Sequence, residues 1–213
     1  MKNPDFKHVK VFGTRHCFNR IADTRANKGR REYTAHICLK KMQDILFEET
    51  LEGPTVRFGA GMIYSDLIKA VLKEGLAIQN LPSLPHINVV GGMITATHGS
   101  GPQHKILAAR VRAMDVVLAD GKLVTLSKAS TPNFESYLIN FGAIGVITSM
   151  TILLERKFYV HKAIYENLRF DSLFNKQNFD QIMHGPDYLS MFMTWRDRCV
   201  DTVWLGKKYQ PGE

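Results

Sequence analysis

Residues 88–101 read NVVGGMITATHGSG and contain no Asp, Glu, Lys or Arg. They lie in a longer segment, 75–104, whose only titratable side chains are three histidines. Pro82 and Pro85 interrupt any helix through this segment, which excludes a membrane span. The four glycines of 88–101 permit close backbone approach, and a cradle of backbone amides can hold a pyrophosphate without a lysine. A glycine-rich turn between two buried strands explains the same composition equally well.

The familiar nucleotide and metal patterns are absent. Residues 59–64, GAGMIY, lack the third glycine of GxGxxG, and no GxxxxGK precedes a Ser or Thr. The eight histidines form no HExxH pair, and Cys17, Cys38 and Cys199 lie far apart. We therefore expect neither a metal site nor a disulfide framework, and a reducing compartment fits the cysteine usage.

The composition is that of an ordinary globular protein, with 45% hydrophobic, 10% aromatic and 23% charged residues. These values exclude collagen-like, low-complexity and disordered classes. At ~100–200 residues per domain, the chain should hold one domain and part of a second. The net charge of +8 is local, because residues 1–44 carry 11 Lys/Arg against 4 Asp/Glu. No stacking aromatics accompany these charges, which favours a solvated basic loop over a nucleic-acid or lipid site.

Strands and helices interleave along the chain, which predicts the α+β class. Asp120-Gly121 between two apolar runs is the strongest hairpin signal. Apolar spacing after Ser65 predicts a helix that this serine caps and Gly75 ends. Its buried face should comprise Leu67, Ile68, Val71 and Leu72. The expected strands are 9–12, 55–58, 111–118, 122–126 and 146–154, and the charged, aperiodic residues 24–44 are expected to be a surface insertion.

His16 follows the expected strand 9–12 on a tight turn that begins at Gly13. We expect this strand to be short and buried, so that it presents the turn rigidly to a site. A lone histidine in such a place is more often structural than catalytic. From the residues alone, both roles of His16 stay open.

Several ordered motifs together resemble the flavin-binding half of the vanillyl-alcohol oxidase family, whose FAD-binding domain is of the PCMH type. They are VFGTRHCFNRIAD at 11–23, NLPSLPHI at 80–87 and the glycine-rich residues 91–101. The similarity is to the alditol (xylitol-type) and aldonolactone (gulonolactone-type) oxidase branch, and it continues through 119–121, 141–148 and 160–165. It implies two α/β subdomains in residues 1–155, incomplete at the N-terminus. A truncated substrate (cap) domain would begin in residues 156–213.

The resemblance also implies the cofactor FAD, bonded covalently to His16 through the methyl group on the benzenoid ring of the flavin. Ser83 would face both flavin and substrate, and the main chain of Ile147 would meet the adenine. Pro82 is compatible with oxygen as the electron acceptor. The pyrophosphate loop would comprise Val11, Phe12, Gly13, Thr14, Arg15, His16 and Cys17, and the isoalloxazine and phosphates would be lined by Asn88, Gly91, Thr95, Ala96, Thr97 and His98.

The implied enzyme oxidises a CH–OH group of an alditol or sugar lactone, with hydride passing to flavin and electrons then to oxygen to give hydrogen peroxide. Two alternatives stay open: a truncated FAD-binding fragment without catalysis, and a basic interaction module using residues 20–41. The groups that orient the substrate in relatives lie beyond Glu213, so the 213 residues alone should not oxidise xylitol, sorbitol or gulonolactone appreciably. Lack of a signal peptide favours the cytoplasm, and neither a transmembrane segment nor a nucleic-acid partner is expected.

Overall fold

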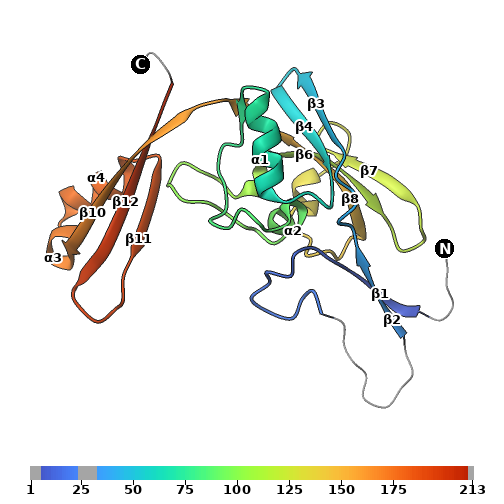
Figure 1. The fold of residues 1–213 in the computed structure, drawn as a ribbon, viewed down its shortest axis with the longest axis horizontal. Helices are drawn as coiled ribbons and strands as arrows, with labels where there is room; N and C mark the ends of the chain where they lie inside the picture. The colour runs from blue at the N-terminus through green and yellow to red at the C-terminus, as the bar shows by residue number, and fades with distance from the viewer. Residues whose placement is uncertain (1–5, 24–32, 211–213) are drawn as a thin grey trace. The chain divides into compact units, whose positions relative to one another are not determined.

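A computed structural model describes residues 6–23 and 33–210 of the chain (Figure 1). The described residues form two compact units, each with its own hydrophobic core. The first unit comprises Met1–Thr97 and Ile106–Glu155, and the second comprises His98–Lys105 and Arg156–Glu213, within those described limits. Both units mix strands with helices, which confirms the predicted α+β class.

A five-stranded antiparallel sheet in the order β3-β4-β8-β6-β7 forms the centre of the first unit. The hairpin predicted around Asp120-Gly121 is confirmed, because β6 pairs with β7 and Gly121 has a φ of +86°. Such a left-handed conformation favours glycine. The predicted strands at 55–58 and 146–154 are confirmed as well. The strand bounds are β3 Ile45–Thr50, β4 Gly53–Gly59, β6 Val111–Val117, β7 Leu123–Ser127 and β8 Val146–Leu153.

The core of the first unit joins this sheet to α1 (Tyr64–Lys73) and α2 (Val89–Ile94) (Figure 1). Phe58 of β4, Met150 of β8 and Met93 of α2 are each 1% exposed. Burying one side chain of this size stabilises the fold by about 1.5–3 kcal/mol, so packing rather than helix propensity holds the helices here. Four shorter elements complete the first unit and its boundary: β5 Leu76–Ala77, η1 Leu107–Arg110, η2 Phe134–Tyr137 and β9 Glu155–Arg156.

The helix predicted after Ser65 exists, but the prediction that Ser65 caps it is wrong. Ile63 is the N-cap residue and Ser65 lies inside the first turn. Backbone bonds replace a side-chain cap, because Tyr64 N–H donates to the Ile87 carbonyl at 3.1 Å and Ser65 N–H to that of Pro85 at 2.7 Å.

The buried face of α1 is narrower than predicted. Leu67 and Val71 are buried, whereas Leu72 is 43% exposed. Leu72 lies about 140° around the helix from Leu67, which places it outside the buried stripe.

Replacing Gly75 by alanine should lower the free energy of unfolding by about 1 kcal/mol. Gly75 ends α1 with a φ of +68°, and a Cβ in this conformation costs roughly 1–2 kcal/mol. Nothing lies within 4 Å of the added Cβ, so the cost is conformational. Ser65→Ala is the comparison. Loss of an N-cap residue would lower the free energy of unfolding by about 1 kcal/mol, but Ser65 lies inside the first turn, so we expect a loss of less than about 0.5 kcal/mol. Urea unfolding measures both, and equal losses would contradict the cap at Ile63.

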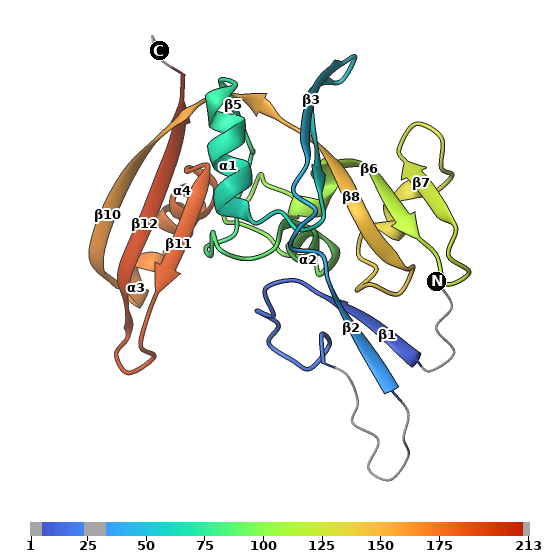
Figure 2. The same cartoon turned by 45° about the vertical axis from the view of Figure 1, so that its right-hand side comes forward.

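A separate two-stranded parallel sheet pairs β1 (Phe6–Phe12) with β2 (Tyr33–Cys38) (Figure 2). The strand predicted at 9–12 is confirmed, but its predicted burial is wrong, since Val9 is 55% exposed. Two strands alone bury little apolar surface. The segment predicted as a surface insertion at 24–44 contains β2, whose residues 36–38 are exposed as expected, but its pairing with β1 makes this part a regular strand. Residues 24–32 of that segment lie outside the described residues.

The chain between β2 and β3 runs against the end of β4. Gly61 N–H donates to the Met42 carbonyl at 2.8 Å, and Gly59 N–H to the Asp44 carbonyl at 2.9 Å. A Cβ on Gly61 would lie 2.3 Å from the Leu39 carbonyl oxygen. This close backbone approach requires glycine and ties the segment after β2 to the five-stranded sheet.

The second unit contains a three-stranded antiparallel sheet in the order β10-β12-β11. Its small core buries Leu173, Val200 and Val203, with Ile182 packed against them. The bounds are β10 Tyr159–Arg169, α3 Phe170–Leu173, α4 Lys176–His184, β11 Tyr188–Phe192 and β12 Cys199–Tyr209. In the described part of the chain, no helix is long and apolar enough to cross a membrane.

Candidate cofactor site

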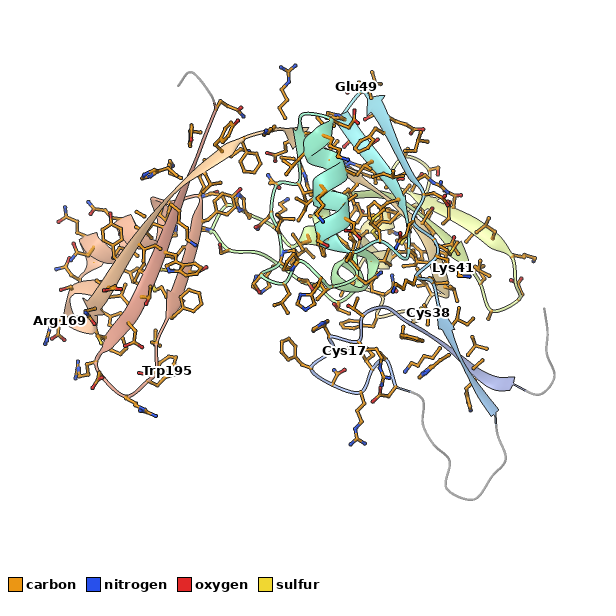
Figure 3. All side chains as sticks on the ribbon, in the orientation of Figure 1. Cys17, Cys38, Lys41, Glu49, Arg169 and Trp195 are labelled. Atoms are coloured by element: carbon orange, nitrogen blue, oxygen red, sulfur yellow. The ribbon has the colours of Figure 1, made fainter. Side chains whose placement is uncertain are left out.

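The loop after β1 leaves its backbone amides free. Residues 13–20 are exposed, and within the described residues the N–H groups of Thr14 to Cys17 make no hydrogen bond. Arg15 has a φ of +58°, and its side chain pairs with Asp23 in the same loop. A left-handed residue in a turn can direct successive N–H groups to one side, as in anion-binding nests. Figure 3 labels Cys17 on this loop.

Asn88 joins this loop to the start of α2. Its backbone N–H donates to Thr14 Oγ1 at 3.2 Å, and its Oδ1 accepts from Gly91 N–H at 2.8 Å. Its Nδ2 donates to the carbonyls of Ala60 at 2.7 Å and Met62 at 3.1 Å. A Cβ on Gly13 would lie 2.7 Å from the Cβ of Asn88, so glycine is needed for this approach. Asn88 thus seats the loop on the first unit.

The glycine-rich stretch is a helix at its start, so the alternative of a turn between two buried strands is wrong. Gly91 and Gly92 lie inside α2, where each costs about 1 kcal/mol relative to alanine. Burial of Val89, Val90 and Met93 together with the Asn88 cap offsets that cost. Gly92 packs closely against Tyr64, because an added Cβ would lie 3.3 Å from the ring carbon Cε2 and 3.4 Å from the hydroxyl.

The Tyr64 hydroxyl is buried without a hydrogen-bond partner among the described residues. Burial raises the pKa of Tyr64 above its ordinary value, so the phenol stays protonated. It faces the glycine face of α2 rather than solvent. No sequence pattern predicted that Tyr64 would be buried against α2.

The residues after α2 are held in an unusual backbone conformation. Ala96 has a φ of +59°, which costs a residue with a Cβ roughly 1–2 kcal/mol. Thr95 Oγ1 donates to the Gly91 carbonyl at 2.9 Å, and Thr97 N–H donates to the Gly92 carbonyl at 3.1 Å. These bonds end α2 and enforce the turn. Backbone outliers of this kind cluster at functional sites, where surrounding contacts over-determine them.

His16 lies against His86, with ring centroids 4.5 Å apart and ring planes at 64°. Ser83 is exposed in the same segment as His86, three residues earlier. The structure therefore brings the His16 loop together with residues 86–91, although about seventy positions separate them. The sequence motif contained His86, but nothing in its spacing predicted this ring contact.

Ile147 and His98, which are also expected at the site, each make contacts of their own. Ile147 is 5% exposed on β8, where its backbone pairs with Val116 next to an irregularity in the ladder. The skipped residue, Thr148, accepts a hydrogen bond at its carbonyl from Ala60 N–H at 2.9 Å. His98 belongs to the second unit, where its Nδ1 lies 2.7 Å from the Gly99 carbonyl oxygen.

A second polar cluster lies on the five-stranded sheet, around Asp115 of β6. Its carboxylate accepts hydrogen bonds from Arg57 at 2.6 Å, Ser149 at 2.6 Å and Thr125 at 2.7 Å. Partial burial by itself would raise the pKa of Asp115, but these three bonds together hold it below its ordinary value. These bonds connect β6 with β4, β7 and β8, which indicates a structural role for Asp115.

Asp115→Asn should destabilise the chain by about 1–3 kcal/mol at neutral pH, the cost of weakening charge-assisted bonds. A carboxylate with a lowered folded pKa stabilises the fold above its unfolded pKa of about 3.9 and loses that contribution as pH falls through the folded pKa. Urea unfolding from about pH 6 to 3 should therefore show a shallower acid loss in the variant than in the original chain. The exposed Asp66→Asn is the control. Identical pH profiles for Asp115→Asn and the original chain would contradict the conclusion that the Asp115 carboxylate stabilises the fold.

No three His, Cys, Asp or Glu side chains of the described residues gather as a metal site. The loop at 13–17 instead offers free amides, a left-handed residue and a glycine pressed against Asn88. Such a donor set fits the phosphates of a dinucleotide. The cysteines are free, with Cys17 and Cys38 exposed and Cys199 half-buried.

Residues 8–127 match the model of a family described as an FAD binding domain. Alditol oxidase from Streptomyces sp. is 36% identical over 154 residues, which cover 72% of this chain and 36% of that protein. L-Gulonolactone oxidase from Mus musculus is 30% identical over 200 residues, 90% of this chain and 43% of that protein. D-Arabinono-1,4-lactone oxidase from Candida albicans is 28% identical over 191 residues, 82% of this chain and 33% of that protein.

The fold is similar to that of a solved structure, a variant of cholesterol oxidase from Brevibacterium sterolicum. The TM-score is 0.81 at 16% sequence identity, with 97% of this chain and 42% of that chain covered. A likeness at this identity shows the fold alone. The chain spans between 33% and 43% of the length of the relatives and the structure named here.

Proposed function

Because this chain belongs to the FAD binding domain family, we propose that it holds FAD at the loop after β1 and serves the oxidation of a polyol or sugar lactone. The observation that carries the proposal is the row of unbonded amides at Thr14 to Cys17, seated on Asn88 beside His16. These amides would bind the pyrophosphate. FAD held there would supply the redox chemistry, accepting a hydride from a carbon that bears a hydroxyl, with oxygen as the final electron acceptor and hydrogen peroxide as the product.

The proposal assigns roles to this chain's own residues. His16 would bond covalently to the flavin, and Ser83 would face flavin and substrate. Ala96, held at a positive φ, would keep the backbone of 95–97 in the conformation that lines the flavin. Ile147 would meet the adenine through its main chain, and His98 would line the phosphates. Residues 156–213 would begin the substrate domain.

The experiment is to purify the chain after expression with excess FAD and to record its intact mass, together with the visible spectrum of the acid-precipitated pellet. A mass increase of one FAD with a yellow pellet supports covalent FAD. A yellow supernatant over a colourless pellet supports FAD binding and contradicts the covalent bond. A colourless chain with an unchanged mass contradicts FAD binding, on which the rest of the proposal depends.

The substrate class is tested on the flavin-loaded chain without oxygen. Xylitol, sorbitol and gulonolactone are mixed with it separately, and loss of the yellow colour is followed. Because the groups that orient the substrate in relatives lie beyond Glu213, we expect only slow bleaching, over hours, by at least one of them, and no appreciable steady-state peroxide formation. Persistence of the colour with all three over that time would contradict the polyol or lactone class and leave FAD binding intact.

The alternative of a basic interaction module gains no support from the described residues. Arg25, Lys28, Arg30 and Arg31 lie outside them. Of the other basic residues in 20–41, Lys40 and Lys41 lie on the exposed turn after β2. Figure 3 labels Lys41 there, and the aromatic pair recorded on the neighbouring β1 and β2, Phe12 with His36, includes neither lysine. We therefore retain the flavoprotein proposal alone.

A further inference from the structure

His86 is held rigidly on both sides by backbone bonds to the start of α1. The Pro85 carbonyl accepts from Ser65 N–H at 2.7 Å, and the Ile87 carbonyl accepts from Tyr64 N–H at 3.1 Å. Tyr64 itself is fully buried. These bonds fix the backbone from which the exposed His86 imidazole reaches the His16 ring.

A hydrogen bond between a backbone N–H and a side-chain hydroxyl links the two segments, two residues from each histidine. Asn88, two positions after His86, donates its N–H to Thr14 Oγ1, two positions before His16. The rings then meet at a centroid distance of 4.5 Å and an angle of 64°, so the edge of one faces the other. This arrangement can limit the rotation of His16 and place a second imidazole within reach of its proton.

The proposed covalent bond sets a specific demand on His16. A bond forms between a His16 ring nitrogen and the methyl carbon of the flavin, while one N–H of His16 and one C–H of the methyl group break. Two protons and two electrons leave in the process, and dioxygen takes them up as hydrogen peroxide. The attacking nitrogen must be the one that carries no proton, and it must be aimed at the methyl carbon. After the attack the ring is positively charged, and the proton that leaves its other nitrogen needs an acceptor.

From the contact with His16 and the two backbone anchors, we propose that His86 is the positioning residue for flavin attachment. It holds the His16 ring in the attacking orientation and accepts the proton that this ring releases. The inference rests on the proposed function, because it presupposes FAD at His16. Its distinct content is that His86 governs how fast the covalent bond forms and not whether FAD binds.

The test is a time course of covalent FAD incorporation into the full 213-residue chain, followed by intact mass after FAD is added to flavin-free protein. His86→Ala should slow the initial rate about 10²-fold or more, the usual cost of removing a positioned base. Noncovalent FAD binding, measured by quenching of flavin fluorescence, should remain unchanged. Added imidazole should restore part of the rate in His86→Ala, which a purely structural defect would not allow.

Two further variants keep the outcome decisive. His86→Gln keeps a polar side chain of similar reach but provides no imidazole base, so it should label slowly while binding FAD normally. His184→Ala removes an exposed histidine at the end of α4 and should label at the original rate. Labelling of His86→Ala at the original rate would overturn the inference alone. If the unmutated chain binds FAD only noncovalently, the inference about His86 is overturned as well. If the unmutated chain binds no FAD at all, the proposed function is overturned together with it.

Discussion

Replacement of His16 by alanine is expected to abolish covalent flavin completely. The variant should show the mass of the unmodified chain, and acid should release all the yellow colour into the supernatant. The reason is chemical: alanine offers no nucleophile for the methyl carbon of the flavin. FAD binding itself should persist, because the free amides at 14–17 belong to the backbone and the Asn88–Thr14 contact does not involve the imidazole.

The matched control for this variant is Cys17→Ser. Cys17 is the next residue, is exposed and carries a second nucleophile on the same loop. If His16 is the attachment point, Cys17→Ser should carry the same covalent mass as the original chain. An acid-stable chromophore in His16→Ala would contradict the assignment, and its loss in Cys17→Ser would move the bond to sulfur.

Asn88→Ala is expected to give the largest loss of stability, about 3 kcal/mol. Its side chain accepts from Gly91 N–H and donates to the Ala60 and Met62 carbonyls. Alanine leaves Gly91 N–H and the Ala60 carbonyl without these bonds, whereas the Met62 carbonyl keeps its bond from Val89 N–H. Losing the cap accounts for about 0.5–2 kcal/mol, and each unsatisfied buried group can cost about 1–3 kcal/mol. Urea unfolding followed by far-ultraviolet circular dichroism measures the change.

Asn175→Ala provides the comparison for Asn88. Asn175 caps α4 by accepting from Gln177 N–H at 3.1 Å, and its bonds are exposed. Its loss should cost about 1 kcal/mol. Equal losses in the two variants would show that the buried bonds of Asn88 add nothing. Asn88→Ala should also weaken FAD loading, because the helix start that seats the Thr14 loop is no longer fixed.

The elements that were predictable are those defined by local chemistry. Asp120-Gly121 allows the left-handed turn of a hairpin, and β6 and β7 form around it. The apolar spacing through Leu67 and Val71 predicted α1, and Gly75 ended it. Each signal lies within a few residues of the structure it specifies, so it is readable without the rest of the chain.

The elements that were missed depend on partners far along the chain. β2 is a six-residue strand inside a charged segment, and its backbone pairs with β1. α2 contains two glycines, yet burial of Met93 and the cap from Asn88 stabilise it. Ser65 resembled a cap, but the carbonyls of Pro85 and Ile87 had already satisfied the first turn.

The sequence by itself determined the family, the α+β class and the motifs that carry the loop at 11–17 and the segments at 80–101, because these are sets of residue types in a fixed order. Only the tertiary structure decided that Asn88 seats the Thr14 loop, that the Tyr64 hydroxyl faces α2 and that His16 meets His86. These are contacts between residues up to seventy-four positions apart. Their geometry depends on the packing of α1 and α2 on one sheet, which no local pattern encodes.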